Sequence, residues 1–291
     1  MHLVDITVRQ AREADIGSIM DLLQTARRRH VPFGREDLPG LLQEGWTFIV
    51  DSPYGLLGVL VVKEAGPGWG LIRALALVDG LPSVLGLRRL VAHACEVLAQ
   101  HHMHTLYCLL SESWLQAPLE ASGFRVTERI VVLYRESDRI PPVPEGPAWL
   151  RPMQQEELEV VVELDAAAFP ERWHYSRPVL TSMLAMGSRF SVAIMHQKIV
   201  GYACVDLHQD IGHIVRLAVH PAYQHQGIGR QLLLEAMAYL KAAGAVRLTV
   251  NTQQSNRRAL RLYRSLGFRP LGRTIPVMER PVERPNAPYF T

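Results

Sequence analysis

The sequence predicts an α/β protein made of two consecutive copies of one domain of mixed helix and strand. Three observations lead to this fold class. The chain has 291 residues, which is enough for about two domains of ordinary size. A dense run of prolines lies near its middle, where neither a long helix nor a central strand can continue. The order of helices and strands expected before that run is repeated after it, as a duplicated domain requires.

The proline-rich run extends from Pro141 to Pro147. Proline has no backbone N–H to donate, and it pushes the residue before it toward extended conformations. We therefore predict a linker at 141–148, a first domain at 1–140 and a second domain at 149–291.

Each half is expected to begin with a short strand and a helix, and to continue with three strands, a second helix and a further strand. A Gly-Phe pair follows in each half. The distance from Ala76 to Gly123 is 47 positions and that from Ala218 to Gly267 is 49, so the two halves keep nearly the same spacing. The expected strands are 6–9, 47–50, 56–63, 71–78 and 105–110 in the first half, and 149–151, 190–196, 199–207, 213–219 and 247–251 in the second.

Composition excludes several classes of protein. Hydrophobic residues make up 48% and charged residues 20%, which is typical of a globular chain and too apolar for a disordered one. No apolar run reaches about 18 residues, and the first residues lack the pattern of a secretory signal. The three cysteines lie far apart, so we expect a reducing cytoplasm and no metal site. The net charge of +3 at pH 7 predicts no strong field for nucleic acid.

The main chemical signal lies in the second half, where an apolar strand, a polar loop with Gly227 and Gly229, and a helix follow one another. Glycine lets the backbone approach a ligand closely, and the first N–H groups of a helix have no internal partner, so this helix start suits an anion such as phosphate. Such a loop also joins a helix to a sheet without any ligand, and the motif alone leaves both interpretations open. The segment contains no Gly-Lys-Ser/Thr, which excludes a nucleoside-triphosphate loop. It follows the last of the three consecutive strands of its domain, whereas a dinucleotide fold would place it after the first strand.

Two motifs in this order carry a family resemblance. Gln224-x-x-Gly227-x-Gly229 resembles the acyl-CoA pyrophosphate loop of the GNAT acetyltransferase superfamily, and N-x-x-A-x-x-L-Y-x-x-L-G-F at 256–268 resembles the second motif of that family. The resemblance covers roughly 150–280, and residues 168–173 are similar to the ribosomal-protein N-terminal-acetyltransferase branch. The family fold implies, for each half, a central mixed, largely antiparallel sheet flanked by helices.

The resemblance implies a binding site for acetyl-CoA as cosubstrate. The strand that ends at Val219 would pair its backbone with the pantetheine arm, and the N–H of Leu217 would donate to the thioester carbonyl. Asn256 would hydrogen-bond the arm. Tyr263 would protonate the departing thiolate, although a tyrosine on an amphipathic helix can also serve packing alone. The implied contacts are Leu217, Ala218, Val219, Gln224, Gln226, Gly227, Ile228, Gly229, Arg230, Asn256 and Tyr263, with the amides of 226–230 around the pyrophosphate.

A general base is also needed, and the family's usual acidic positions correspond here to His213 and Asn251. Asparagine cannot accept a proton at neutral pH, whereas an imidazole titrates near pH 6.5. We expect His213 to accept the amine proton through a water chain, since in a straight strand it lies about 13 Å before Leu217. A histidine at a strand edge can also be plain surface. The predicted catalytic residues are therefore Tyr263, His213 and Leu217, with Asp206, Asp210 and Glu171 as weaker alternatives for the base.

The first half departs from the family pattern at the corresponding positions. Leucines replace both glycines of the loop, and a leucine replaces the tyrosine. Leucine side chains would block the close approach of a phosphate, and proline removes a backbone donor. We expect this domain to keep the fold and to lack acetyl-CoA catalysis. The departing residues are Pro82, Leu85, Leu87, Glu112 and Leu119.

The expected function is transfer of an acetyl group from acetyl-CoA to a primary amine by direct attack, catalysed by the second domain. The acceptor would be a small molecule or a protein N-terminus, and the aromatic residues Trp173 and Tyr175 would line its cleft. The alternative is a non-enzymatic acyl-CoA-binding sensor or interaction module, which the missing acidic base favours and Tyr263 disfavours. We expect a monomer or homodimer with neither a nucleic-acid nor a membrane partner.

Overall fold

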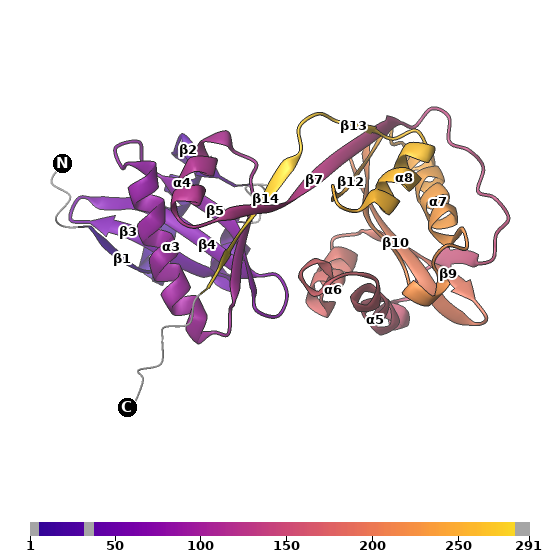
Figure 1. Ribbon diagram of the computed structural model, residues 1–291, viewed down its shortest axis with the longest axis horizontal. Coiled ribbons are helices and arrows are strands. Elements are labelled where there is room, and N and C mark those ends of the chain that lie inside the picture. Colours follow the sequence, from indigo (N-terminus) through magenta and orange to yellow (C-terminus); the bar gives the residue numbers. More distant parts are fainter. Residues whose placement is uncertain (1–5, 32–37, 283–291) are drawn as a thin grey trace. The chain divides into compact units, whose positions relative to one another are not determined.

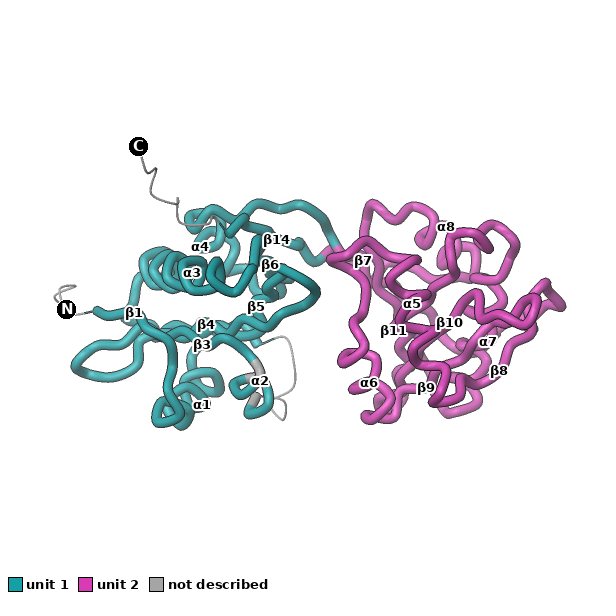
Figure 2. The backbone as a smooth tube through the Cα atoms, turned by 90° about the horizontal axis from the view of Figure 1, so that it is seen from below, with its two compact units in different colours: residues 1–129, 275–291 teal, residues 130–274 magenta. Residues whose placement is uncertain are grey.

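The computed structural model describes residues 6–31 and 38–282. The chain divides into two compact units, of which unit 1 comprises Met1–Arg129 and Ile275–Thr291 and unit 2 comprises Ile130–Thr274 (Figure 2). Each unit is a mixed sheet flanked by helices, so the predicted fold class is confirmed.

Unit 1 is built on a sheet with the strand order β1-β3-β4-β5-β6-β14, and β2 pairs with β5. Its neighbouring strands are antiparallel except β5 and β6, which are parallel. The strands are β1 (Thr7–Gln10), β2 (Arg28–His30), β3 (Trp46–Ser52), β4 (Gly55–Glu64), β5 (Trp69–Leu77), β6 (Thr105–Leu109) and β14 (Ile275–Pro281). The helices are α1 (Ile16–Thr25), α2 (Leu38–Glu44), α3 (Ser83–Gln100) and α4 (Gln116–Ala121), with short 3-10 turns η2 (Glu13–Asp15) and η4 (Ser113–Leu115).

The two faces of this sheet bury two separate apolar clusters. Phe48 and Leu60 pack in the cluster under α3, which lies across the sheet in Figure 1. Their chain neighbours Ile49 and Val59 pack in the cluster that contains Ile19 of α1. Successive side chains of a strand point to opposite faces, so these continuous apolar strands serve both clusters.

Unit 2 repeats this plan with the strand order β8-β9-β10-β11-β12-β7, and β13 pairs with β7. Only β11 and β12 are parallel neighbours. The strands are β7 (Arg125–Glu136), which begins in unit 1, β8 (Trp149–Pro152), β9 (Arg189–Met195), β10 (Lys198–His208), β11 (Ile211–Val219), β12 (Arg247–Gln253) and β13 (Arg269–Pro270). The helices are α5 (Leu158–Ala168), α6 (Arg177–Ala185), α7 (Ile228–Ala242) and α8 (Arg257–Ser265), with 3-10 turns η5 (Gln155–Glu157), η6 (Glu171–Trp173) and η7 (Pro221–Tyr223).

Helix α7 packs on one face of this sheet and α5 on the other. Leu232, Leu233 and Leu240 of α7 are fully buried, and each contributes about 2 kcal/mol through the apolar area it removes from water. On the opposite face, Leu164 of α5 packs in a cluster with Tyr202 of β10. The two helices therefore cover the two faces of the sheet with their buried apolar side chains.

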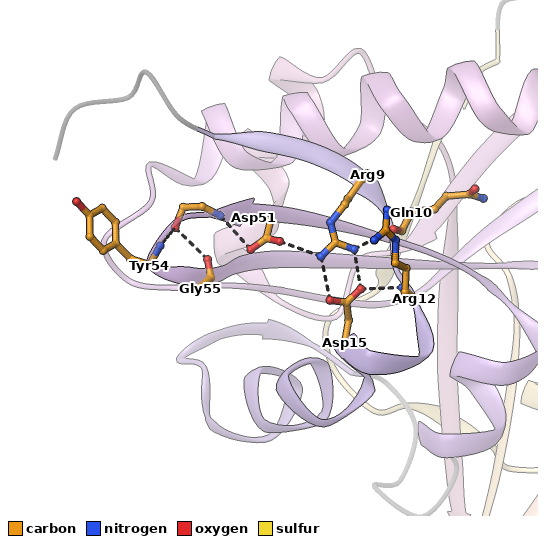
Figure 3. A network of polar contacts seen from close by, with 8 residues as sticks. Arg9, Gln10, Arg12, Asp15, Asp51, Tyr54 and Gly55 are labelled. Carbon is orange, nitrogen blue, oxygen red and sulfur yellow. Dashed lines mark hydrogen bonds and ion pairs between the residues drawn. The ribbon is translucent and has the colours of Figure 1, made fainter.

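Each unit has an equivalent ion pair near its start, as expected of a duplicated domain. In unit 1 the guanidinium of Arg9 contacts Asp15 at 2.6 Å and Asp51 at 2.8 Å (Figure 3). In unit 2 Arg151 contacts Glu157 with the same spacing along the chain, at 2.7 Å. Each acid also accepts the backbone N–H of the residue three positions before it, which caps the following turn. Hydrogen bonds from Arg9 lower the pKa of Asp15 to about 2.

The proline-rich stretch predicted as an interdomain linker lies within unit 2. There it runs along α7, because the side-chain amide of Gln231 donates to the carbonyls of Pro144 (3.4 Å) and Ala148 (3.1 Å), and the ammonium of Lys241 donates to that of Asp138 (2.6 Å). Prolines do break the regular structure here, as expected, but the chain does not change units at this point.

The change of unit occurs instead within β7 and just before β14, which shifts the predicted boundaries of 1–140 and 149–291. From Ile130 to Glu136, β7 pairs with β12 and completes the sheet of unit 2. From Val277 to Pro281, β14 pairs with β6 and completes the sheet of unit 1. Each half of the chain thus donates its last strand to the unit formed by the other half.

Within 6–31 and 38–282 no helix is both long and apolar enough to cross a membrane. The same residues contain no cluster of three or more histidine, cysteine, aspartate or glutamate side chains that could hold a metal ion. Cys95, Cys108 and Cys204 form no disulfide and are all buried.

Candidate functional site

In unit 2, strand β11 loses its parallel neighbour partway along its length. Pairing with β12 runs from Ile211 to Ile214, whereas pairing with β10 continues to Val219. The N–H of His220 donates to Val200 of β10 at 2.9 Å. Because alternate residues direct their N–H groups to opposite edges, those of Leu217 and Val219 face away from β10. We call this side of residues 217–219 the open edge of β11.

A β-bulge precedes the open edge. Ile214 lies opposite Val205 and Arg216 opposite Cys204, so Val215 is the extra residue. A bulge shifts the alternation of side chains. As a result Val215 and Arg216 both project toward α5, whereas Leu217 packs on the α7 side. Unit 1 has the same bulge in β5, at the position of Arg73.

The open edge leads into the N-terminus of α7. Gly227 caps this helix with φ +89°, a conformation that L-residues with side chains rarely adopt. The N–H groups of Arg230 and Gln231 donate to the carbonyl of Gly227, at 3.0 and 3.1 Å. In the described part of the chain, no backbone acceptor is present for the N–H groups of Gly227, Ile228 and Gly229. These three amides are free of backbone acceptors, whereas that of Arg230 donates within the helix start. The assignment of the amides of 226–230 to a pyrophosphate remains a prediction.

The two glycines of this loop have room for a side-chain carbon at their Cβ positions. A Cβ added at Gly227 would meet nothing within 4 Å. A Cβ at Gly229 would lie 3.7 Å from Val219 and 3.8 Å from Leu262, which is ordinary van der Waals contact. Packing of the chain therefore does not require glycine at position 229.

Two of the predicted contacts serve the structure around this loop. The side-chain amide of Gln224 donates to the carbonyl of Val219 at 2.8 Å and accepts from Arg258 of α8. Asn256 caps α8 by accepting the N–H of Ala259 at 3.1 Å, which leaves its NH₂ group as a donor. Gln226 is exposed. The assignment of these three residues to acetyl-CoA remains a prediction.

Tyr263 lies in the last turn of α8, about two turns after Asn256. Its side chain is 6% exposed and packs with Leu260 and Phe268, with ring centroids 5.9 Å apart in the Tyr263–Phe268 pair. Burial raises the pKa of Tyr263 to about 12, against the opposing effect of the positive charge of Arg216. The phenol is thus held as a proton donor, while the packing role weighed in the sequence analysis is also present.

His213 lies between β10 and β12 rather than at a free strand edge. Its Nδ1 is 2.9 Å from the hydroxyl oxygen of Thr249, and that hydroxyl donates to the carbonyl of Gly212 at 3.3 Å. The network assigns the ring proton to Nδ1 and leaves Nε2 as a free acceptor. Burial lowers the pKa of His213, with Asp206 on the facing strand acting in the opposite direction. A neutral imidazole at physiological pH follows from this environment.

The other candidates for the base lie in different places. Asp206 is half-buried opposite His213. Asp210, Glu171 and Asn251 are exposed.

One polar group near the open edge escaped the sequence analysis. Asp165 of α5 is fully buried and accepts two hydrogen bonds from Arg216, the residue before Leu217. The available signal was an aspartate among apolar residues on the inner face of an amphipathic helix, because buried carboxylates are rare unless they are paired.

In unit 1 the edge that corresponds to the open edge is filled by the chain itself. Ala76 aligns with Ala218, so Leu75 and Leu77 stand where Leu217 and Val219 stand in unit 2. Strand β2 pairs there, with Arg28 opposite Leu77 and His30 opposite Leu75. A strand of three residues leaves no periodic signal, and the sequence analysis did not detect it.

Two further contacts hold β2 in that position. The guanidinium of Arg28 donates to the carbonyls of Leu81 (2.9 Å) and Asp79 (3.2 Å), in the loop that leads to α3. The buried ring of His30 lies 3.0 Å from the hydroxyl of Ser111, and burial lowers its pKa to about 4.

A family model described as the acetyltransferase (GNAT) family matches residues 158–268. This stretch contains the open edge of β11, the N-terminus of α7 and Tyr263. Unit 2 is a GNAT domain. The predicted family is therefore confirmed. A solved structure of a tandem GNAT protein from the clavulanic acid biosynthesis pathway has the same fold over both units, with a TM-score of 0.68 and 19% identity, and the match covers 97% of this chain and all of that one.

Curated proteins resemble only part of the chain. A mycothiol acetyltransferase of Streptosporangium roseum is 39% identical over 61 residues, which is 21% of this chain and 18% of that protein. A ribosomal protein bS18-alanine N-acetyltransferase of Escherichia coli (strain K12) is 37% identical over 71 residues, which is 24% of this chain and 48% of that protein. The chain thus spans less than half the length of these two relatives in the aligned segment.

Proposed function

We propose that unit 2 is an acetyl-CoA-dependent N-acetyltransferase that acts on a primary amine. The observation that carries the proposal is the continuity between the open edge of β11 and the free amides at the start of α7. An extended chain that ends in a pyrophosphate matches this arrangement, because the backbone N–H and C=O groups along the edge suit its carbonyls and amides and the helix N-terminus suits its charge. The open space before Gly227 and Gly229 fits such a group.

The residues of unit 2 take distinct roles in this proposal. Bound acetyl-CoA supplies an activated acetyl group, which the amine takes by direct attack with release of the CoA thiol. The N–H of Leu217 donates to the carbonyl oxygen on which negative charge gathers during attack. Nε2 of His213 accepts the proton of the amine through water, and the hydroxyl of Tyr263 donates a proton to the leaving sulfur.

Unit 1 takes no part in the chemistry under this proposal. Its corresponding edge already has β2 as a partner, and leucines replace both loop glycines. An acyl-CoA would have to displace β2, together with the hydrogen bonds of Arg28 and the buried ring of His30. We therefore assign one acetyl-CoA site to each chain, in unit 2.

The acceptor is a primary amine on a small molecule or at a protein N-terminus. The names of the two curated relatives support both sources, since one refers to mycothiol and the other to the alanine of a ribosomal protein. A panel of small amines, amino sugars and peptides with free N-terminal alanine, assayed by release of free thiol from acetyl-CoA, separates them. It also tests the alternative of a non-enzymatic acyl-CoA-binding module, which would bind CoA and release no thiol with any amine.

The location of the site is tested by calorimetric titration of CoA into the full chain. We expect one site per chain in the wild type and loss of binding in Gly229→Leu, because the side chain would fill the space before the free amides. Gly17→Leu is the matched control, since Gly17 is a glycine in the first turn of a helix of unit 1 and an added Cβ there would meet nothing within 4 Å. Two equivalent sites, or unchanged binding in Gly229→Leu, would contradict the assignment.

A further inference from the structure

Unit 2 contains a buried ion pair that the proposed reaction does not use. The guanidinium of Arg216 donates to both carboxylate oxygens of Asp165, each at 2.7 Å, and the hydroxyl of Tyr202 donates to the same carboxylate at 2.5 Å. The side chain of Asp165 is fully buried and that of Arg216 is 10% exposed. Removing two charges from water costs several kcal/mol per ion, so stability alone does not explain a pair at this place.

Unit 1 shows that the fold does not need these charges. Its helix α1 has Leu23 seven positions after its first residue, as α5 has Asp165. Ala74 corresponds to Arg216, because each lies two residues before the aligned alanine, Ala76 or Ala218. Val59 corresponds to Tyr202, because each lies opposite that alanine on the neighbouring strand. All three residues belong to one apolar cluster in unit 1. The same layer of the fold is therefore built without a polar group.

In unit 2 the ion pair holds the connection that follows α5, which we call the 169–175 connection. The guanidinium of Arg216 donates to the carbonyl of Trp173 at 2.6 Å, and Asp165 accepts the N–H of Tyr175 at 2.6 Å. The guanidinium also lies between two rings, 3.5 Å from the centroid of Phe169 and 4.0 Å from that of Tyr175. The connection is thus fixed to the α5 side of β11, at the residue before Leu217.

The corresponding connection of unit 1 takes another path. Counted from the first residue of each helix, 28–30 in unit 1 correspond to 170–172 in unit 2. In unit 1 these residues form β2 and fill the edge of β5. In unit 2 they begin η6, and the edge of β11 stays open. The unit with the ion pair keeps its connection out of the edge, and the unit without the pair does not.

We propose that Asp165 and Arg216 are positioning residues that hold the 169–175 connection in place beside the open edge. In this position the connection forms one side of the binding site for the amine. This inference rests on the proposed function, since it assigns the amine to that side of β11. The pair acts through the backbone of Trp173 and Tyr175 and through the ring of Phe169, so it affects the amine rather than acetyl-CoA.

The test uses the full chain with Asp165→Leu/Arg216→Ala, which introduces the residues that unit 1 has at these positions. We expect the variant to unfold cooperatively and to bind CoA with nearly wild-type affinity. Hydrogen exchange at the amide of Tyr175 should accelerate, and KM for the most active amine of the panel should rise about 10- to 100-fold. Arg216→Lys keeps the charge but loses the two-pronged contact, so its KM should lie in between.

The matched control is Glu235→Leu/Arg189→Ala, which removes another ion pair of unit 2, with its oxygen and nitrogen 2.5 Å apart. It should leave the exchange at Tyr175 and KM for the amine unchanged. Unchanged exchange and unchanged KM in Asp165→Leu/Arg216→Ala would overturn the inference, and so would joint loss of CoA binding and cooperative unfolding, which would mean a purely structural pair. If the wild type acetylates no amine, the proposed function fails. Hydrogen exchange at the Tyr175 amide and the affinity for CoA still decide in that case whether the Asp165–Arg216 pair positions the connection.

Discussion

Replacing Tyr263 with phenylalanine isolates the chemical role of one hydroxyl from the packing role of its ring. The ring is buried against Leu260 and Phe268, and phenylalanine preserves those contacts. Because burial raises the pKa of Tyr263 to about 12, only about 10⁻⁵ of the phenol is ionised at pH 7. If this hydroxyl protonates the leaving sulfur, kcat should fall roughly 10²- to 10⁴-fold in Tyr263→Phe, the range typical of a positioned proton donor.

The measurement is thiol release under saturating acetyl-CoA, together with the calorimetric affinity for CoA and the thermal midpoint of unfolding. Affinity and midpoint should stay near the wild-type values, since only the oxygen is removed. In the wild type kcat should not decline with rising pH below about pH 11, because the donor keeps its proton over that range. Tyr239→Phe is the control, as Tyr239 is a partly exposed tyrosine of α7. Wild-type turnover in Tyr263→Phe would leave Tyr263 with packing alone, and an alkaline decline near pH 10 that disappears in the variant would contradict the raised pKa.

Three further outcomes are expected. Since burial lowers the pKa of His213, kcat/KM should rise with pH through an inflection below 6.5 and lose this inflection in His213→Ala; an identical profile in the variant would exclude this base. Trp173→Ala should raise KM for the amine and leave KM for acetyl-CoA unchanged. If neither KM changes, Trp173 serves packing alone. Asp15→Asn should lower the free energy of unfolding at pH 7 by about 1–2 kcal/mol. Arg9 holds the pKa of Asp15 near 2, so this difference should shrink as pH falls from about 4 to 2, and a difference independent of pH would argue against the ion pair.

The sequence was sufficient for the features that depend on local chemistry. The succession of apolar strand, glycine loop and helix around Gly227 follows from local composition and glycine conformation, and it lies where it was predicted. The repeated order of elements likewise predicted the duplicated fold. Each of these features is set by residues that are close together in the chain.

The features that the sequence did not predict depend on partners distant in the chain. Asp165 is 51 residues from Arg216, and nothing local reveals the pairing. β2 is recognisable only through its register on β5. The proline-rich stretch was predicted to be a linker because prolines break regular structure. They also do so in a segment that packs along a helix of its own unit, and the hydrogen bond from Gln231 to Ala148 places this stretch along α7.

The exchanged last strands bear on the order in which the units can mature during synthesis. Unit 2 has all of its strands once residue 274 has been made, because β7 precedes it in the chain. Unit 1, although its first strand is made early, lacks β14 until about residue 281 has left the ribosome. The edge of β6 therefore stays without its antiparallel neighbour while the whole of unit 2 is translated, so the usual sequence of domain folding from the N-terminus is reversed for the final step. A chain that stopped directly after residue 274 would have all the strands of unit 2, whereas β6 of unit 1 would keep an unpaired edge, the kind of edge that promotes association with other chains.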